Sequence, residues 1–299
     1  MARLRHFSGR PRHEKAVILG QLMRRARNRI SPRLPLPVRL PWGFWWLAWN
    51  DICGDAILRG TFEPREQRFT ERFLRSGMSV LDIGAHHGFY TLMASDRVGP
   101  RGHVVAFEPS PRERRRLLWH VRLNRCTNVR VEATALGGRE SRADLFMVTG
   151  RQTGCNSLRP PDVNEGTRVL QVPVVTLDTY MVREKMAPVD FIKIDVEGAE
   201  LEVLSGAQEF LRREPRPVIL CEVQDLRTRP WGYKAEEILI CLSGMGFSWF
   251  EPALDGTLEP IAARREHCDG NFVAVPAERL EEIRALVRTA PPALWPRLS

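Results

Sequence analysis

V-L-D-I-G-A-H-H-G-F-Y-T, at residues 80–91, is the stretch of sequence that decides the fold. It begins with a short apolar run and ends in a turn with Gly84 and Gly88. Glycine has no Cβ, so the chain can turn sharply there and a ligand can come close to the backbone. The stretch therefore predicts a buried strand over 79–84, a glycine turn and a helix over 89–98.

The same alternation of strands and helices continues along the chain. Further strands are expected over 103–107, 129–135, 143–148, 168–175, 189–196, 218–223 and 271–275. Further helices are expected over 66–75, 111–124, 200–211 and 235–243. Because the strands are continuous apolar runs, they predict a parallel sheet that helices cover on both faces. Ligands of such sheets bind beyond the carboxyl ends of the strands, so the residues that end each strand are the candidates for chemistry.

Composition and cysteine usage limit the class of protein. The chain has 299 residues and is 43% hydrophobic, which allows a large core and excludes wholesale disorder. No apolar run approaches the roughly 18 residues of a membrane span, and none resembles a signal peptide. The six cysteines form no C-x-x-C pair, which disfavours a zinc ribbon or a thioredoxin-type site. We therefore expect a cytoplasmic protein with free thiols.

The positive charge of the chain is concentrated at its start. The net charge is +9, and residues 1–50 hold eleven Lys/Arg and one acid, Glu14. The remainder holds 45 − 11 = 34 bases and 36 − 1 = 35 acids, so it is close to neutral. A neutral body argues against a globular nucleic-acid reader with a broad basic face. We expect the start of the chain to be a basic arm with one helix near 14–29.

Four tryptophans follow this arm. Trp42, Trp45, Trp46 and Trp49 are spaced as i, i+3, i+4 and i+7, which predicts one face of a helix that packs on the body. Two alternatives stay open, namely contact with a membrane interface next to the basic arm and a lid over an active site.

The end of the second strand indicates the class of ligand. Glu108 follows Gly84 by 24 residues, where doubly wound nucleotide-binding folds place an acid on a ribose diol. The chain lacks G-x-G-x-x-G and G-K-[ST], so neither a dinucleotide nor a P-loop nucleotide is expected. S-adenosylmethionine has no phosphates and needs only a looser glycine turn, and Asp82 can face its ammonium group. The alternative is a glycine turn of purely structural use, with an acid on the surface.

Four segments together resemble the FkbM-type methyltransferases, which are class I S-adenosylmethionine-dependent enzymes. They are V-L-D-I-G-A-H-H-G-F-Y-T (80–91), A-F-E-P-S (106–110), F-I-K-I-D-V-E-G-A-E (191–200) and the late N-F-V-A-V (271–275). The resemblance covers roughly residues 60–276. The glycine turn of the family more often has Asn-x where this chain has His86 and His87.

The resemblance implies an α/β fold with a doubly wound, mostly parallel, seven-stranded Rossmann-like sheet and helices on both faces. It also implies S-adenosylmethionine as cofactor and O-methylation of a hydroxyl on a sugar, glycolipid or secondary metabolite. The residues expected to bind the cofactor are Asp82, Gly84, Ala85, His86, Gly88, Glu108, Pro109, Ala135 and Asp195. The expected parts of the chain are a basic arm (1–50), a helical lead-in (51–78), the methyltransferase domain (79–276) and a C-terminal helix and tail (277–299).

Acidic residues at the strand ends are the candidates for the reaction itself. Lys193 and Asp195 lie on one face of their strand. A lysine there is hard to bury without a partner, so we expect it to pair with Asp195 or Glu222. We predict that Asp195, Glu197 and Glu222 are catalytic and line the acceptor side, with one of them as general base.

Three alternatives to this assignment stay open. The acids and Lys193 can form a charge network that only shapes the site, or the three carboxylates can hold Mg²⁺, which prefers oxygen ligands. His86 or His87 can be the base, although packing is the more frequent role of such residues. We do not expect a metal ion in the site.

Two loops are expected to shape the choice of acceptor. These are the polar stretch 151–166 and the stretch 227–233, whose Trp231 and Tyr233 either stack on a sugar ring or pack against the next helix. His120 is expected at the surface or in an interface.

The expected partner is a small-molecule hydroxyl acceptor, with peripheral contact of the arm with anionic membrane as an addition. One rival function is an RNA or DNA methyltransferase that grips phosphates with the arm. The [DN]-P-P-[YF] motif of amino-methylating enzymes is missing, which disfavours it. The other rival is a membrane-associated protein without activity, which the intact glycine turn and Glu108 disfavour.

Overall fold

A computed structural model describes residues 34–289 of the chain. The expected helix near 14–29 lies outside the described residues. All six cysteines are free. No helix in the described part has both the length and the apolar composition that a bilayer crossing requires.

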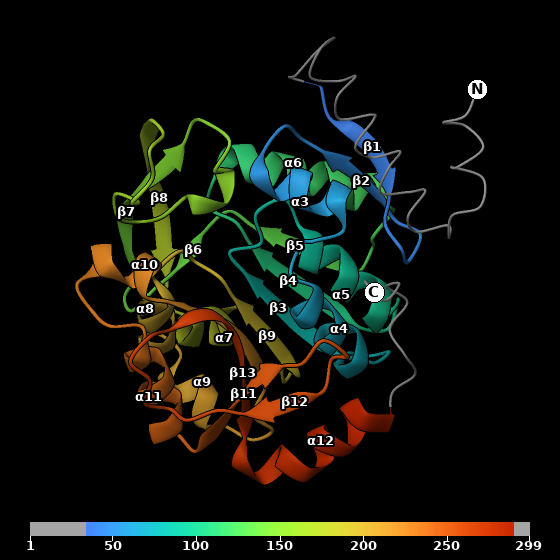
Figure 1. Cartoon of the computed structure of the whole chain (residues 1–299), viewed down its shortest axis with the longest axis vertical. Helices are drawn as coiled ribbons and strands as arrows, with labels where there is room; N and C mark the ends of the chain where they lie inside the picture. Colours follow the sequence, from blue (N-terminus) through green and yellow to red (C-terminus); the bar gives the residue numbers. More distant parts are fainter. Residues whose placement is uncertain (1–33, 290–299) are drawn as a thin grey trace, which may run out of the picture.

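The centre of the molecule is one large sheet (Figure 1). Its strands are, in spatial order, β12 (Leu258–Pro260), β11 (Phe247–Pro252), β13 (Asp269–Pro276), β10 (Val218–Gln224), β9 (Phe191–Ile194), β3 (Ser79–Ile83), β4 (His103–Phe107) and β5 (Val129–Glu132). Neighbouring strands from β10 to β5 are parallel, whereas β13 runs antiparallel to both β10 and β11. The predicted doubly wound, mostly parallel sheet is confirmed, and the short β12 adds an eighth strand at its edge.

Helices cover both faces of this sheet, as predicted (Figure 1). One face carries α4 (Pro64–Phe73), α5 (Phe89–Val98), α6 (Pro111–Leu123) and α12 (Leu280–Thr289). The other carries α7 (Leu177–Arg183), α8 (Glu200–Ser205), α9 (Gln208–Arg212) and α11 (Glu236–Gly244). Strand β3 shows why both faces are buried, because Val80 packs into the first core and its neighbour Leu81 into the second.

A small second sheet lies beside the carboxyl edge of the large one. It has the order β6 (Ala135–Leu136), β8 (Thr167–Val175) and β7 (Ser141–Val148). The expected strands 143–148 and 168–175 are thus confirmed, while the expected strand 129–135 is divided between the two sheets. The expected helix 200–211 is also divided, into α8 and α9. Short helices complete the fold at η1 (Thr153–Cys155), α10 (Asp225–Thr228), η2 (Arg229–Trp231) and η3 (Ala277–Arg279).

The helix predicted from Trp42 to Trp49 is wrong. The segment contains a strand, β2 (Trp45–Ala48), which pairs antiparallel with β1 (Leu36–Arg39) in a hairpin. Side chains of a strand alternate between its faces, so Trp46 is fully buried while Trp45 is exposed. The i, i+3, i+4 spacing was misleading, because the segment is stabilised by pairing with residues that precede it.

After the hairpin the chain continues into α3 (Ile52–Arg59). The side chain of Asp51 caps this helix by accepting a hydrogen bond from the Gly54 N–H at 2.7 Å. The hairpin and α3 together lie over the carboxyl ends of β3 and β4 (Figure 1). They thus form one wall of the region in which ligands of doubly wound sheets bind.

Candidate active site

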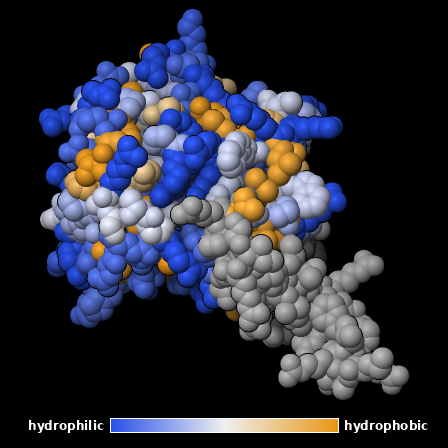
Figure 2. Space-filling view, turned by 90° about the horizontal axis from the view of Figure 1, so that it is seen from above, coloured by the Kyte–Doolittle hydropathy of each residue, from blue (hydrophilic) through white to orange (hydrophobic). Residues whose placement is uncertain are grey.

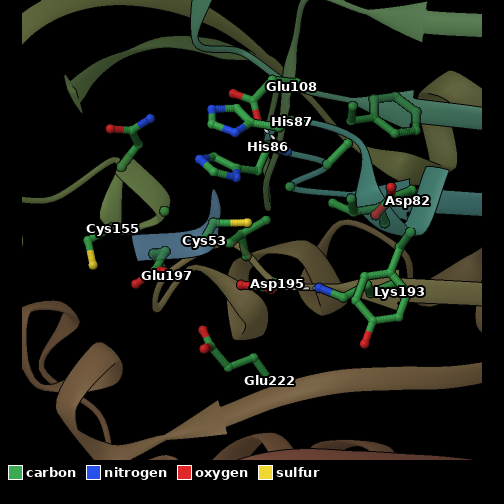
Figure 3. A pocket seen from close by; sticks show the side chains of 18 of the residues that line it. Cys53, Asp82, His86, His87, Glu108, Cys155, Lys193, Asp195, Glu197 and Glu222 are labelled. Atoms are coloured by element: carbon green, nitrogen blue, oxygen red, sulfur yellow. Dashed lines mark hydrogen bonds and ion pairs between the residues drawn. The ribbon is translucent and has the colours of Figure 1, made fainter. Parts of the chain in front are cut away.

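A cavity of about 360 Å³ lies at the carboxyl ends of β3, β4, β9 and β10. Side chains that lie far apart in the sequence, from Trp46 to Arg227, line it, and Figure 3 shows how several of them point toward one another. The predicted site residues that line it are Asp82, Gly84, Ala85, His86, Glu108, Pro109, Ala135, Asp195, Glu197 and Glu222. The structure therefore brings nearly the whole predicted set together in one cavity.

The predicted Gly88 is not part of the cavity wall. It is the N-cap of α5 with a φ of 86°, and a Cβ there would lie 2.1 Å from the Leu117 side chain. Gly88 thus lets α5 and α6 pack closely.

Gly84 has a different environment. Its φ is 83°, and a Cβ would lie 1.8 Å from the backbone oxygen of Asp195. The end of β3 and the end of β9 are therefore in direct backbone contact, and no side chain fits between them.

Glu108 closes the glycine turn from the neighbouring strand. Its two carboxylate oxygens accept hydrogen bonds from the N–H of His86 at 2.7 Å and from the N–H of Ser110 at 2.8 Å. Burial, followed by the charge of Glu113, raises the pKa of Glu108 to about 8. The carboxylate is thus fixed in orientation at one end of the cavity, and each oxygen keeps a free lone pair for a ligand hydroxyl.

The two histidines of the turn are packed against each other. The rings of His86 and His87 stack with centroids 3.7 Å apart, and Nε2 of His87 lies 2.9 Å from the Arg116 guanidinium. Burial lowers the pKa of both, and that of His87 lies well below its usual range. This environment favours the packing role for both residues over that of general base.

The expectation that His120 lies at the surface or in an interface is wrong. His120 is fully buried under the hairpin, where its ring stacks on Trp46 with centroids 4.0 Å apart. Nε2 accepts a hydrogen bond from the Leu47 N–H at 2.9 Å, and Nδ1 donates to the His87 oxygen at 2.7 Å. Both ring nitrogens are used, so a neutral His120 joins the hairpin to the glycine turn.

Low pH is expected to weaken this contact between the hairpin and the glycine turn. Burial lowers the pKa of His120 to about 4, while a histidine in an unfolded chain titrates near 6.5. The unfolded state therefore binds more protons between these pH values, so the stability contributed by neutral His120 is complete above about pH 6.5 and is lost toward pH 4. Between pH 7.5 and 5 the loss amounts to about 2 kcal/mol.

Urea unfolding of the wild type and of His120→Gln, at both pH values, isolates this contribution. The difference in unfolding free energy between the two proteins is expected to shrink by about 2 kcal/mol at pH 5. Buried carboxyl groups with raised pKa, such as Glu108, act in the opposite direction, but they are present in both proteins. A difference that stays the same at both pH values would contradict the assignment.

Lys193 is the centre of a buried charge network on one side of the cavity. Its ammonium donates to Asp195 Oδ2 at 2.5 Å, which confirms one of the two expected partners, and lies 4.7 Å from the ring centroid of Tyr90. Burial alone would lower the pKa of Lys193, but the charges of Asp195, Glu63 and Asp82 outweigh it and raise the pKa. Lys193 is thus a fixed cation that orients the acids around it.

Glu63 and Tyr90 are site residues that the sequence did not reveal. Glu63 lines the cavity from the turn before α4, and the Tyr90 hydroxyl donates to its Oε2 at 2.6 Å. Burial raises the pKa of Glu63 to about 7 against the opposing charge of Lys193. The only local signal was an acid before Pro64, which indicates a helix start and says nothing about which cavity the turn faces.

The three predicted catalytic acids lie close together on the other side of the cavity. Asp195, Glu197 and Glu222 each present a carboxylate oxygen within 4.8 Å of the others. The Arg227 guanidinium lies 2.8 Å from Glu197, so two of the three acids have a basic partner. Burial raises the pKa of Glu197 to about 8, although Arg227 opposes this.

Glu222 is the acid that differs from the other two. It is only 8% exposed, and its Oε2 has neither a hydrogen-bond partner nor an ion-pair partner among the described residues, whereas Glu197 is paired with Arg227. Burial, followed by the charges of Asp195, Glu197 and Glu200, raises the pKa of Glu222 well above its usual range. Glu222 therefore binds a proton more readily than an ordinary glutamate does. In Figure 3 it faces Asp195 from the end of the cavity opposite to Glu108.

Backbone strain is concentrated around this cavity. Glu63, His86 and Glu197 adopt the left-handed region, with φ values of 37°, 51° and 56°, and all three line the cavity. Residues with side chains rarely adopt this conformation, and they do so mostly where function or packing requires it.

The two loops have different relations to the cavity. Six residues of the stretch 151–166 line it, from Gln152 to Leu158. From the stretch 227–233 only Arg227 lines it. Tyr233 donates to the Gly198 oxygen at 2.7 Å, and a Cβ on Gly198 would lie 2.5 Å from Trp231. The packing alternative thus describes both aromatic residues.

Comparison with known proteins gives a family match over residues 82–248, described as a methyltransferase FkbM domain. A relative named Methyltransferase 1, from Beauveria bassiana, is 26% identical over 146 residues, which are 44% of this chain and 58% of that protein. The aligned region thus spans a little over half of the relative's length.

Two solved structures are also similar. The structure of Aeropyrum pernix fibrillarin in complex with S-adenosyl-L-methionine has a TM-score of 0.39 and 18% identity, with 67% of each chain covered. That of an O-methyltransferase from Bacillus cereus in complex with SAH has a TM-score of 0.42 and 16% identity, with 72% of this chain and 82% of that chain covered.

Proposed function

Because the chain belongs to the methyltransferase FkbM family, we propose that it methylates a hydroxyl group of a small molecule, namely a sugar, glycolipid or secondary metabolite. S-adenosylmethionine is its methyl donor. The observation that carries the proposal is the cavity, which has a nucleoside-type carboxylate at one end and three clustered acids at the other.

The residues of the cavity fit this donor. Its volume suits a ligand of this size. The Gly84 turn leaves the backbone bare beside Asp195, and Glu108 is oriented by two backbone N–H groups so that it can accept the hydrogen bonds of a ribose diol. When bound, the donor supplies a methyl group on a positively charged sulfur.

The protein must remove a proton from the acceptor. An aliphatic hydroxyl has a pKa of about 16, so a free alkoxide at pH 7 would cost about 12 kcal/mol. Proton loss must therefore accompany attack on the methyl group, with a base in hydrogen-bond reach of the hydroxyl.

Glu222 is the acid best suited to be this base. Asp195 is engaged by Lys193 and Glu197 by Arg227, so both carboxylates already have a cationic partner. Glu222 has a buried oxygen without a partner and a raised pKa. We propose that Glu222 takes the proton from the acceptor hydroxyl, and that Asp195 and Glu197 position the acceptor and the donor.

The same three carboxylates are close enough for one cation to contact them all. However, Lys193 and Arg227 already balance two of their three charges. Adding Mg²⁺ would place a double positive charge beside two fixed cations. We therefore propose that the reaction needs no divalent metal.

Glu108→Gln tests the donor site. The amide has one acceptor oxygen where the carboxylate has two, and its NH₂ must face an N–H of His86 or Ser110. We expect the Kd for S-adenosylhomocysteine, measured by titration calorimetry, to rise by about 10–100-fold, because the amide loses an acceptor and leaves a backbone N–H without its partner.

The control for this variant is Glu140→Gln at an exposed position, which should bind as the wild type does. If the wild-type protein binds neither S-adenosylmethionine nor S-adenosylhomocysteine, the proposed function is wrong. If Glu108→Gln binds like the wild type, only the role of Glu108 is wrong.

A further inference from the structure

We propose that the face built by the β1–β2 hairpin and α6 docks on an anionic membrane surface. This inference does not rest on the proposed function. We define the docking face by Leu34, Arg39, Trp45, Arg115, Trp119, Arg122 and Leu123. The hairpin and α6 lie side by side at one end of the molecule, because the Asn124 side chain bonds both the N–H and the oxygen of Trp45. Figure 2 views this end and shows hydrophobic residues among strongly hydrophilic ones.

Large apolar side chains are exposed on this face. Trp45 and Trp119 are each 42% exposed and Leu123 is 45% exposed. Trp119 and Leu123 are four residues apart on α6, so they lie on the same side of the helix. Tryptophan is enriched at membrane interfaces, where its ring meets the acyl boundary and its N–H stays in the polar region.

Arginine side chains accompany these aromatic rings. The guanidinium of Arg39 lies 5.5 Å from the ring centroid of Trp45, and that of Arg115 lies 5.7 Å from that of Trp119. Arg39, Arg115 and Arg122 form no ion pair with any described acid, so their charges are available to a partner.

Exposed acidic side chains are missing from the segments that build the face. Residues 34–50 contain no Asp or Glu, and residues 111–128 contain six arginines and one acid, Glu113, which is fully buried. The sequence that precedes the hairpin, residues 1–33, contains ten Lys/Arg and one acid. The charge of the described face therefore complements an anionic surface, and the sequence before it is basic as well.

The mixture of residues favours lipid over nucleic acid. A phosphate grip needs basic side chains, but it gives no use for the exposed Leu123 or for Leu34, which is 63% exposed. Apolar residues that are rimmed by arginine match the interfacial mode of membrane binding, in which apolar side chains enter the acyl boundary and basic ones contact the headgroups.

The test is co-sedimentation of the full chain with vesicles of phosphatidylcholine containing about 30% phosphatidylglycerol, compared with pure phosphatidylcholine, at low and high salt. We expect binding to the anionic vesicles that salt weakens. Each basic residue near such a surface contributes about 1 kcal/mol, or about fivefold in partition coefficient. Arg115→Glu/Arg122→Glu should therefore lower partitioning at least 25-fold, and Trp45→Ser/Leu123→Ser about tenfold.

The matched control is Arg168→Glu/Arg213→Glu, which makes the same charge change at exposed positions on β8 and after α9. It should keep most of the binding. All variants are checked for unchanged Tm and S-adenosylhomocysteine affinity, so that failure here is separate from failure of the methyltransferase assignment.

Four outcomes overturn the proposal. The first is that the wild-type protein does not bind anionic vesicles at low salt, and the second is that the control variant loses as much binding as the face variants. The third is that both face variants bind vesicles as the wild type does. The fourth is that the protein binds a single-stranded RNA but no vesicles, and that the face variants abolish the RNA binding. The third would assign membrane binding to residues 1–33, and the fourth would make the face a nucleic-acid surface.

Discussion

Replacing Glu222 with glutamine is expected to lower kcat by about 10²–10⁴-fold, the usual contribution of a positioned general base. The amide keeps the size of the side chain but cannot take a proton. Because Glu222 lies at the end of the cavity opposite to Glu108, the affinity for S-adenosylhomocysteine should stay within about threefold of the wild type. The measurement is a methyl-transfer assay with a competent acceptor, together with titration calorimetry.

The pH–rate profile separates a base from a merely structural acid. Burial and neighbouring acids raise the pKa of Glu222, so the wild-type rate should rise with pH until this group is ionised, and Glu222→Gln should lack this rise. The exposed Glu209→Gln is the control and should behave as the wild type. A Glu222→Gln variant that keeps more than about a tenth of the wild-type kcat would exclude Glu222 as the base.

The same methyl-transfer assay tests whether the reaction needs a divalent metal. After exhaustive chelation the wild-type rate should be unchanged, because Lys193 and Arg227 supply the positive charge in the cluster. A rate that disappears and returns with Mg²⁺ would show that a cation occupies the three carboxylates.

Replacing Gly84 with alanine is expected to lower the free energy of unfolding by about 2–5 kcal/mol and to abolish binding of S-adenosylhomocysteine. A φ of 83° costs an L-residue about 1–2 kcal/mol. The added Cβ would lie 1.8 Å from the Asp195 oxygen, and relieving such an overlap in a packed site costs about 1–3 kcal/mol more. Urea unfolding and calorimetry measure the two effects.

Gly77→Ala is the matched control, because Gly77 has a similar φ of 91° but no atom within 4 Å of its Cβ position. It carries the backbone strain without the overlap, so it should cost about 1–2 kcal/mol and leave binding intact. Equal effects of the two substitutions would show that the contact between the ends of β3 and β9 is not what makes Gly84 necessary. If Gly84→Ala fails to fold while Gly77→Ala folds, the overlap is still supported.

The elements predicted with the right bounds are those whose signals are local. Residues 89–98 and 103–107 were predicted as a helix and a strand, and α5 and β4 have these bounds. A turn with glycines and an uninterrupted apolar strand can each be recognised from a few consecutive residues. Helix α7 and strands β11 and β12 were missed, because α7 and β12 are short and because β11 is held by its pairing with β12 and β13, which the local sequence does not reveal.

The clustering of the three acids was predictable for a topological reason. Carboxyl ends of neighbouring parallel strands meet at one edge of a sheet, so acids that end β9 and β10 must lie close together. The contributions of Glu63, Tyr90 and Arg227 were not predictable, because each depends on the path of a loop or on the packing of a helix against distant residues. The error at Trp42–Trp49 has the same origin, since a strand partner is visible only in three dimensions.

The origin of the cavity wall has a consequence for how acceptor preference can change. Trp46, Cys53 and Glu63 line the cavity, yet they precede residue 82, where the match to the family begins. One wall of the cavity is thus built by a stretch of sequence that precedes the region matched by the family model. We expect a chimera that takes residues 34–63 from another family member to exchange this wall, including Glu63, while it keeps the glycine turn and the three clustered acids, so its range of acceptors would test whether the wall shapes substrate choice.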